Sequence, residues 1–227
     1  MQSNIVHDEN LRKEIQQRLI RFDRIQHTEP DLTSAAVVIG ISTLLNATSA
    51  SILLTQRSSR LRKHAGQYAL PGGKIDRGES VIEAALRELE EELGLHQSDD
   101  SVLGFLDDMP THSGFNITPV VVWIDSLVDL KPNPDEVAEI YQIPLTELES
   151  IDLNLTQEHP DQDITPGEDI KNQSRASEND VMSLYLPSVG TTVYSPTAAI
   201  IYQFRELAIL GKTTRVAHFG QPRFAWR

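Results

Sequence analysis

The sequence predicts an α/β fold in which a mixed β-sheet lies between α-helices, with added helices towards both ends. Short apolar runs typical of buried strands alternate with segments whose apolar residues return every three or four positions, as on one helix face. The chain has 227 residues, 39% of them hydrophobic, which is enough for one core but short for two domains. We therefore expect one main domain with additions at its ends.

The first predicted element is a helix over residues 8–22. Its apolar residues are Leu11, Ile15, Leu19 and Phe22. They share one side because their spacing follows the helical repeat. We expect this helix to pack on the domain or on a partner subunit. Two apolar runs typical of buried strands follow, at residues 35–41 and 51–57.

The next helix has the clearest boundaries. Ser80 and Glu83 form a capping-box pattern at its start, and Gly94 fits the position where a helix ends. Its apolar face consists of Val81, Ile82, Ala85, Leu86, Leu89 and Leu93. Further strands are predicted at residues 102–106, 119–124 and 139–145, the last leading into a short helix around Glu147.

The predicted elements then stop over residues 152–180, a segment rich in acidic and polar residues with almost no apolar periodicity. We expect a flexible acidic insertion there. A strand at 182–186 would resume the sheet. The last helix should begin with Ser195 as cap and Pro196 in the first turn, and end near Leu210 before Gly211. Residues 1–30 would form an N-terminal helical extension and residues 31–227 the domain.

The charge and composition exclude several classes of protein. The net charge is −13, and two segments account for most of it: residues 79–92 carry −5 and residues 152–180 carry −6. No basic face suited to nucleic acid is evident, and no run approaches the ~20 apolar residues of a membrane span. The chain has no cysteine, which excludes disulfides and thiolate chemistry. The polar N-terminus is unlike a secretory signal, so we expect a cytoplasmic protein.

Three carboxylates crowd one face of the helix that follows Ser80. Glu88, Glu91 and Glu92 stand at i, i+3 and i+4, beside Arg87. Like charges at this spacing repel each other unless a cation lies among them. Because Mg²⁺ and Mn²⁺ prefer oxygen ligands, the pattern predicts a site for a hard divalent cation.

Residues 73–95, GKIDRGESVIEAALRELEEELGL, resemble the Nudix box, G-x5-E-x7-R-E-U-x-E-E-x-G-U, where U is a bulky aliphatic residue. The nine matching positions are Gly73, Glu79, Arg87, Glu88, Leu89, Glu91, Glu92, Gly94 and Leu95. The resemblance implies a Nudix fold, a mixed sheet sandwiched between helices. It also implies hydrolysis of a diphosphate joined to another moiety, with Mg²⁺ or Mn²⁺ as cofactor.

The resemblance also implies a role for each acidic residue of the box. Glu88 and Glu92 would be metal ligands, Glu91 a ligand or the activator of water, and the backbone carbonyl around Gly73 a further ligand. Arg87 would orient the carboxylates by pairing with Glu79 or Glu91; the alternative is an ordinary helix ion pair.

A general base outside the box occurs in some Nudix families. The candidates in this chain are Glu136 and Glu139, in the segment NPDEVAEIYQIPL.

The segment before the box narrows the choice of substrate. Residues 53–73, LLTQRSSRLRKHAGQYALPGG, resemble the coenzyme A pyrophosphatase subfamily, whose pattern is LLTxRSxxLRxHxGQxxFPGG. Residues 113–120 and 133–137 resemble it too. Leu70 departs from the pattern, which has Phe. Residues 194–196, Tyr-Ser-Pro, depart where the subfamily tends to have Trp-Gly. The implied substrate is coenzyme A or an acyl derivative, cut to 3′,5′-ADP and 4′-phosphopantetheine or its acyl derivative.

Basic residues of this segment are candidates for substrate binding. They are Arg57, Arg60, Arg62, Lys63 and His64. Arginine matches phosphate oxygens in pairs, and these cations lie next to the box in the sequence. The alternative is a solvated strand end and loop. His64 either donates to phosphate or caps a turn.

Two other functions stay open at this stage. One is a Nudix hydrolase that acts on ADP-ribose, NADH or a nucleoside triphosphate. The other is a Nudix-fold nucleotide sensor without catalysis, although such proteins usually lose glutamates of the box. The expected partner is a small-molecule nucleotide, with no nucleic acid and no membrane. The apolar side of the first helix and the tail at 219–226 make a homodimer plausible.

Overall fold

The computed structural model describes residues 5–45, 47–61, 64–157 and 180–222. The helices are α1 (Glu9–Arg21), α2 (Val81–Leu93), α3 (Leu145–Ser150) and α4 (Thr197–Phe204), with a 3₁₀-helix η1 (Asp99–Ser101) and a π-helix η2 (Arg205–Ile209). The strands are β1 (Thr33–Thr43), β2 (Ala50–Arg57), β3 (Tyr68–Ala69), β4 (Gly72–Lys74), β5 (Val102–Phe105), β6 (Met109–Pro110), β7 (Phe115–Trp123), β8 (Val137–Pro144), β9 (Asn154–Gln157), β10 (Asp180–Leu186) and β11 (Thr191–Tyr194).

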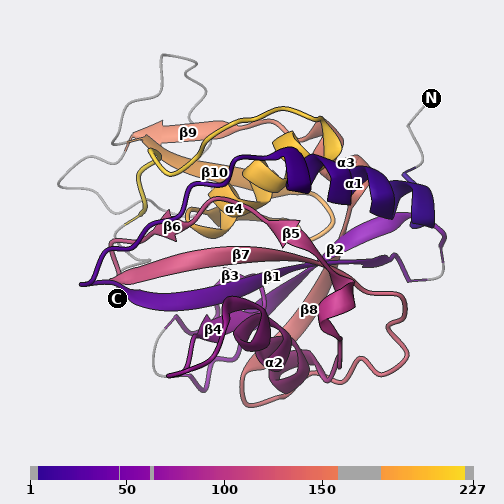
Figure 1. The fold of residues 1–227 in the computed structure, drawn as a ribbon, viewed down its shortest axis with the longest axis horizontal. Helices are drawn as coiled ribbons and strands as arrows, with labels where there is room; N and C mark the ends of the chain where they lie inside the picture. Colours follow the sequence, from indigo (N-terminus) through magenta and orange to yellow (C-terminus); the bar gives the residue numbers. More distant parts are fainter. Residues whose placement is uncertain (1–4, 46, 62–63, 158–179, 223–227) are drawn as a thin grey trace.

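A mixed eight-stranded sheet forms the centre of the molecule. Its main path is β3-β2-β1-β7-β5, with β8 on β2, β4 on β1 and β6 on β7. β1 and β7 are parallel, whereas the other pairs are antiparallel. The helix α2 covers one face, and α1 and α4 cover the other (Figure 1). This arrangement confirms the predicted mixed sheet between helices.

The sheet divides the core into two layers. Successive side chains of a strand point to opposite faces. Accordingly Ala36 and Val38 of β1 pack in the layer beneath α2, together with Leu89. Ile39 and Ile41 belong to the larger layer, which also contains residues of α1 and α4. β1 therefore supports both layers of the core.

The first helix packs inside its own chain. Asp8 caps α1, since its carboxylate accepts hydrogen bonds from the backbone N–H groups of residues 10 and 11. Ile15, Leu19 and Phe22 are buried in the core. Phe219, from the C-terminal segment, is also buried, and residues 223–227 lie outside the described part. The apolar side of α1 therefore gives no support to the expected homodimer.

The start of the last helix differs from the prediction. α4 begins at Thr197, and the side chain of Ser195 does not cap it. Ser195 is buried, and its hydroxyl donates instead to the Met182 carbonyl. The peptide bond between Ser195 and Pro196 is cis. The helix continues into η2, and the chain then turns at Gly211, whose φ is 67°.

Part of the expected acidic insertion is a strand. β9 lies within the range 152–180 and pairs with β10 in a second, three-stranded sheet, with β11 on the other side of β10. Residues 158–179 lie outside the described part of the chain. β7 is longer than predicted and begins at Phe115, because it pairs with β1 over nine residues from Thr33 onwards.

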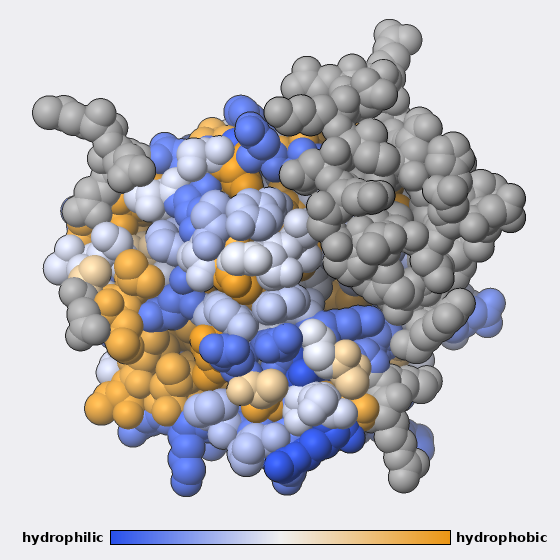
Figure 2. Space-filling model, turned by 180° about the vertical axis from the view of Figure 1, so that it is seen from behind, coloured by the Kyte–Doolittle hydropathy of each residue, from blue (hydrophilic) through white to orange (hydrophobic). Residues whose placement is uncertain are grey.

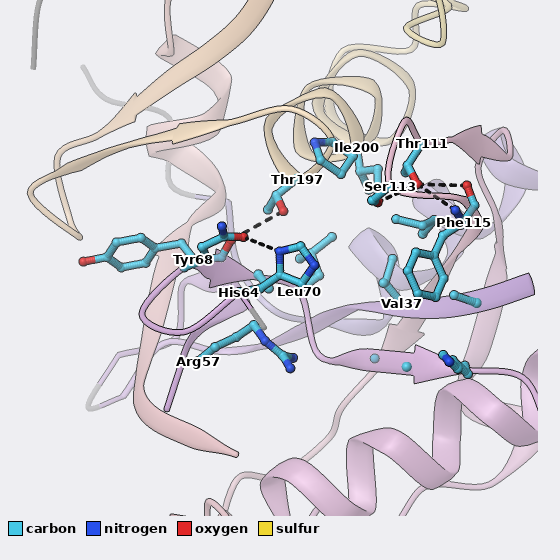
Figure 3. Close-up of a pocket in the computed structure, with 18 residues that line it drawn as sticks. Val37, Arg57, His64, Tyr68, Leu70, Thr111, Ser113, Phe115, Thr197 and Ile200 are labelled. Carbon is cyan, nitrogen blue, oxygen red and sulfur yellow. Dashed lines mark hydrogen bonds between the residues drawn. The ribbon is translucent and has the colours of Figure 1, made fainter. Parts of the chain in front are cut away.

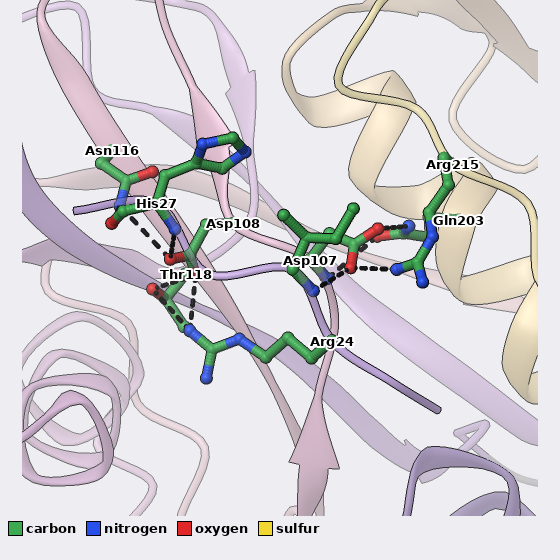
Figure 4. A network of polar contacts seen from close by, with 9 residues as sticks. Arg24, His27, Asp107, Asp108, Asn116, Thr118, Gln203 and Arg215 are labelled. Atoms are coloured by element: carbon green, nitrogen blue, oxygen red, sulfur yellow. Dashed lines mark hydrogen bonds and ion pairs between the residues drawn. The ribbon is translucent and has the colours of Figure 1, made fainter. Parts of the chain in front are cut away.

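Two buried aspartates tie segments far apart in the sequence together (Figure 4). Asp108 accepts hydrogen bonds from the side chains of Arg24 and Thr118 and from the backbone N–H of His27. Asp107 accepts from the side chains of Gln203 and Arg215 and from a backbone N–H of the segment after α1. These bonds anchor the segment after α1 and the segment that contains Arg215 to the strands around β6.

The surface carries few large apolar side chains. Figure 2 shows the molecule from behind the view of Figure 1. The described part of this face is mostly hydrophilic, with an apolar area towards one edge. The large hydrophobic residues exposed in the described part are Ile20, Ile25, Leu45, Val128 and Tyr185. In the residues described, every helix is too short or too polar to cross a membrane.

Candidate active site

Local sequence signals set the position of α2. Ser80 and Glu83 form the predicted capping box: the Ser80 side chain accepts from the backbone N–H of Glu83, and the Glu83 side chain accepts from that of Ser80. Gly94 ends the helix in the left-handed conformation, with φ 71°. The apolar face of α2 is buried against the sheet. Glu88, Glu91 and Glu92 are therefore carried on a helix that is fixed at both ends, whereas Glu79 lies just before it.

Two glycines bring the backbone of β4 close to its neighbours. A Cβ atom on Gly72 would lie 2.3 Å from the Ala36 carbonyl oxygen, and Gly72 has a φ of 155°. A Cβ on Gly73 would lie 2.2 Å from a carboxylate oxygen of Glu88. At Gly72 the close atoms are backbone, so this position needs a residue without a side chain, whereas at Gly73 the close atoms are the end of the flexible Glu88 side chain. The Gly73 backbone and the Glu88 carboxylate, both proposed as metal ligands, are thus neighbours.

Arg87 binds three carboxylates of the box. It holds Glu79 with two hydrogen bonds, from Nε at 2.8 Å and from NH2 at 3.1 Å. Its NH1 donates to Glu88 at 2.8 Å and to Glu91 at 3.0 Å. Its NH2 also donates to the Lys74 carbonyl, at 3.1 Å. Arg87 therefore links α2, β4 and the loop between them, and it pairs with both of the partners expected for it.

Glu88 and Glu92 stand in an environment that disfavours their charge. Burial raises the pKa of Glu92 to about 8, and the nearby Glu88 and Glu136 carboxylates add to this, although Arg57 opposes it. Burial also raises the pKa of Glu88, with contributions from Glu91 and Glu136. The Glu92 side chain is 5% exposed, and among the described residues it forms an ion pair with Arg57, whose Nη1 lies 3.9 Å away. Within the described residues, Arg57 and Arg87 are the cations that pair with this cluster, and its carboxylates outnumber them.

The oxygen atoms of the box are suitable ligands for a hard divalent cation, although the carboxylates do not converge on one point. The available groups are carboxylate oxygens and the backbone around Gly73, the ligands that Mg²⁺ and Mn²⁺ prefer. Within the described residues, no group of three or more acidic or histidine side chains is placed to hold a metal ion. Arg87 engages Glu88 and Glu91 instead. The excess negative charge around buried Glu92 is what a cation would neutralise.

A cavity of about 270 Å³ opens beside β4, and its lining contains Gly73 of the box but none of the box glutamates. It lies between β1, β3, β4, the start of β7 and the N-terminal end of α4 (Figure 3). Its lining includes Gly72, Gly73 and Arg57, so the cavity adjoins the box. The apolar wall consists mainly of Val37, Leu70, Phe115, Ile117 and Ile200. Leu70, the departure from the subfamily pattern, is itself part of this wall.

The predicted basic residues separate in the structure. Arg57 lines the cavity and faces Glu92. His64 lines it too, with a φ of 55° and its ring nitrogen Nδ1 3.2 Å from Oε1 of Gln67. Arg60 is exposed, forms an ion pair with Asp135 and is not part of the lining. Arg62 and Lys63 lie outside the described residues.

The two candidates for a general base differ in position. Glu136 lies close enough to Glu88 and Glu92 to raise the pKa of each. Glu139 accepts a hydrogen bond from the Tyr141 hydroxyl at 2.7 Å. Of the two, Glu136 is the better placed to act with the box carboxylates.

Sequence reasoning missed several residues of the cavity. Among them are Lys74, Thr111, Phe115 and Thr197. They come from β4, from the segment around the start of β7 and from α4, which only the folded sheet brings together. The sole signal was indirect: residues 113–120 belong to a stretch that resembles the subfamily.

The chain matches the family model described as the NUDIX domain over residues 35–166. A curated relative, the "Uncharacterized Nudix hydrolase NudL" of Pectobacterium atrosepticum, is 49% identical over 98 residues, which cover 43% of this chain and 51% of the relative. The protein of the same name from Escherichia coli strain SMS-3-5 is 42% identical over 127 residues, covering 56% and 62%. The chain thus spans about half the length of the curated relatives it matches.

Solved structures show a weaker likeness. The MutT protein of Methanosarcina mazei Go1 is 21% identical, with a TM-score of 0.42 over 57% of this chain and 85% of that one. The NUDIX domain of Shewanella oneidensis NrtR, solved in complex with ADP ribose, is 19% identical, with a TM-score of 0.39 over 54% and 81%. The family model covers more than half of the chain, including the whole box. The chain therefore belongs to the NUDIX domain family.

Proposed function

We propose that this chain is a diphosphatase dependent on Mg²⁺ or Mn²⁺, whose substrate is coenzyme A or an acyl derivative. The products would be 3′,5′-ADP and 4′-phosphopantetheine or its acyl derivative. One observation carries the proposal: Arg57, from the segment before the box, lines the cavity and lies 3.9 Å from Glu92. It stands where the diphosphate of a ligand in the cavity would meet the carboxylates.

Each box residue has a role in this reaction. Glu88, Glu92 and the backbone around Gly73 would hold the metal, which screens the diphosphate charge and favours ionisation of bound water. Arg87 holds the carboxylates in position, and Arg57 contacts a phosphate oxygen. The oxygen of water attacks one phosphorus of the diphosphate, the bond from that phosphorus to the bridging oxygen breaks, and the other phosphate leaves with the bridging oxygen and the electron pair of the bond. Glu91, which is exposed, or Glu136 takes the proton of the attacking water.

The cavity would bind an organic part of the substrate. Its lining is mainly apolar and includes a few polar side chains, such as His64, Gln67 and Thr197. A pocket of this kind, apolar with few polar groups, is typical of sites for small molecules. The pocket is thus compatible with the small-molecule nucleotide expected as partner. The compartment expected for the reaction is the cytoplasm.

Product analysis with a panel of substrates tests the proposal. The purified chain would be given coenzyme A, ADP-ribose, NADH and diadenosine polyphosphates, each with Mg²⁺ and then Mn²⁺. We expect coenzyme A to have the highest kcat/KM. If another compound of the panel is turned over faster, coenzyme A is not the preferred substrate, but the proposed reaction class is unaffected. If no phosphoanhydride is cleaved with either metal, the proposed enzyme activity is wrong.

A variant tests the role given to Glu91 in catalysis. Glu91→Gln keeps the size of the side chain and removes the carboxylate. Since Glu91 is exposed, the fold should be spared while turnover falls by orders of magnitude. Unchanged turnover would contradict the role given to this residue.

A further inference from the structure

The cavity has a second cation, at a different place from Arg57. Lys74 lines the cavity, and its ammonium lies 5.8 Å from the centre of the Phe115 ring. In the described part of the chain, Lys74 has no carboxylate within ion-pair distance. A contact with an aromatic face contributes only about 0.5–1 kcal/mol at an exposed site. The ammonium therefore remains available to an anion.

The sheet fixes this pair beside the box. Lys74 follows Gly73 directly, and its carbonyl accepts a hydrogen bond from Arg87. In the register of β1, Ala35 pairs with Lys74 of β4 on one side, and Thr33 pairs with Phe115 of β7 on the other. Figure 3 shows Arg57 and Phe115 on different sides of the cavity. The cavity thus has one cation near the carboxylates and another beside an aromatic ring.

This arrangement matches a ligand with a flat ring and a phosphate outside its diphosphate. An aromatic side chain offers a stacking surface to a base, and an ammonium pairs with phosphate oxygens. We propose that Phe115 and Lys74 form a specificity subsite for a phosphorylated nucleoside. Phe115 stacks on the base, and Lys74 pairs with the 3′-phosphate. The inference rests on the proposed function, since coenzyme A carries a 3′-phosphate that ADP-ribose and NADH lack.

Turnover of two substrates tests the role of Lys74. Coenzyme A and dephospho-coenzyme A differ only in the 3′-phosphate. We expect Lys74→Gln to lower kcat/KM for coenzyme A by about ten-fold or more, the usual effect of losing a hydrogen bond to a charged group. The value for dephospho-coenzyme A should change little. An equal loss with both substrates, or no loss with either, would overturn the proposal.

A matched control removes the same charge elsewhere. Lys131 is exposed, lies in the loop after β7 and does not line the cavity. Lys131→Gln should leave the ratio of the two kcat/KM values as in the parent chain. A similar change of the ratio in this variant would assign the effect to overall charge and would overturn the subsite.

Equilibrium binding separates this inference from the proposed function. Calorimetric titration without metal would compare 3′,5′-ADP with 5′-AMP, which lacks the second phosphate. We expect tighter binding of 3′,5′-ADP, with the preference lost in Lys74→Gln and kept in Lys131→Gln. If this holds but coenzyme A is not hydrolysed, the proposed function fails and the subsite stands. No preference in the parent chain would overturn the subsite, whatever the turnover.

A second variant tests the stacking. Phe115→Leu keeps an apolar side chain at the same place but removes the ring. This change should weaken the binding of 3′,5′-ADP and of 5′-AMP equally, by about ten-fold, because both contain the same base. Unaltered binding of both would overturn the role of Phe115.

Discussion

At the scale of single residues, the two glycines of β4 differ in what surrounds them. A Cβ on Gly72 would meet backbone atoms, the Ala36 carbonyl oxygen at 2.3 Å and the Val37 Cα at 2.6 Å. Backbone in a sheet cannot move away cheaply. We therefore expect Gly72→Ala to lower the free energy of unfolding by about 2 kcal/mol or more, as measured by urea denaturation. A change below about 0.5 kcal/mol would contradict the tight approach.

Gly73→Ala is the matched comparison. The new Cβ would meet the far end of the flexible Glu88 side chain, 2.2 Å away. That carboxylate can turn aside, so stability should change far less than in Gly72→Ala. Displacement of a proposed ligand should instead lower the affinity for Mn²⁺ and the turnover by about 10-fold or more. Calorimetry with Mn²⁺ checks this; parent-like affinity would argue that Gly73 and Glu88 do not share a site.

Glu92 gives a prediction on pH in protein freed of divalent ions by a chelator. Its pKa is raised to about 8 from an ordinary value of 4.5, mainly through burial. The folded state therefore keeps a proton that the unfolded state releases above about pH 4.5, and stability from this group falls as pH rises to about 8. Glu92→Gln should remove this decrease of stability with rising pH, because the amide does not ionise.

We expect Glu92→Gln to have a higher Tm than the parent chain at pH 8 and a smaller difference at pH 5. Thermal unfolding followed by circular dichroism would measure both. A difference in Tm that does not depend on pH would show that burial of this carboxylate is not costly. Added Mg²⁺ should raise the Tm of the parent chain and not that of the variant.

At the scale of elements, the capping box contributes directly to α2. Ser80→Ala removes the acceptor for the Glu83 backbone N–H and should cost about 1 kcal/mol of stability. Ser98 is a matched control, because it precedes η1 without a cap hydrogen bond from its side chain. Ser98→Ala should therefore change stability by less than about 0.5 kcal/mol. Equal losses in urea denaturation would contradict the role given to the cap.

The same helix shows what a sequence can predict. Its start, end and apolar face follow from contacts between residues three or four apart, so local patterns were enough. β4 could not be predicted in this way, because its three residues form a strand only by pairing with β1. Ser195 was misassigned for a similar reason. Its hydroxyl donates to the Met182 carbonyl on β10, a partner that its neighbours in the sequence do not indicate.

At the scale of the whole molecule, Asp108 links the segment after α1 to the sheet. Burial alone would raise its pKa, but hydrogen bonds from Arg24, the His27 N–H and Thr118 outweigh burial and lower the pKa below 3.8. A lowered pKa contributes stability that is present above about pH 3.8 and is lost as pH falls through the folded value.

Asp108→Asn should therefore destabilise the chain by about 3 kcal/mol at pH 7, since it leaves the half-buried Arg24 without its partner. The difference from the parent chain should shrink towards pH 3. Urea denaturation at both pH values would measure it. Asp129→Asn, an exposed aspartate, serves as control and should have little effect at either pH. An effect of the same size at pH 3 and pH 7 would exclude linkage to this carboxylate.

Some residues of the candidate site could be predicted from local sequence patterns, whereas others depend on pairing between distant strands. Glu88, Glu91 and Glu92 were predicted as a group because they lie within one helix. Arg57 was predicted as a substrate ligand from its place before the box, and the structure adds its approach to Glu92. Lys74 and Phe115 were not predicted, because they are 41 positions apart in the sequence and meet only through their separate pairings with β1. Spacing along a chain contains no record of such pairings.

The alternation of β1 has a practical consequence for redesign. Ala35 and Val37 line the cavity, whereas Ala36 and Val38 pack beneath the helix that carries the carboxylates. Libraries randomised only at the first two positions would reshape the space for ligand and leave the support of the acids intact. Selectivity for a ligand could thus evolve in small steps, each leaving intact the helix that carries the carboxylates on the far side of the same strand.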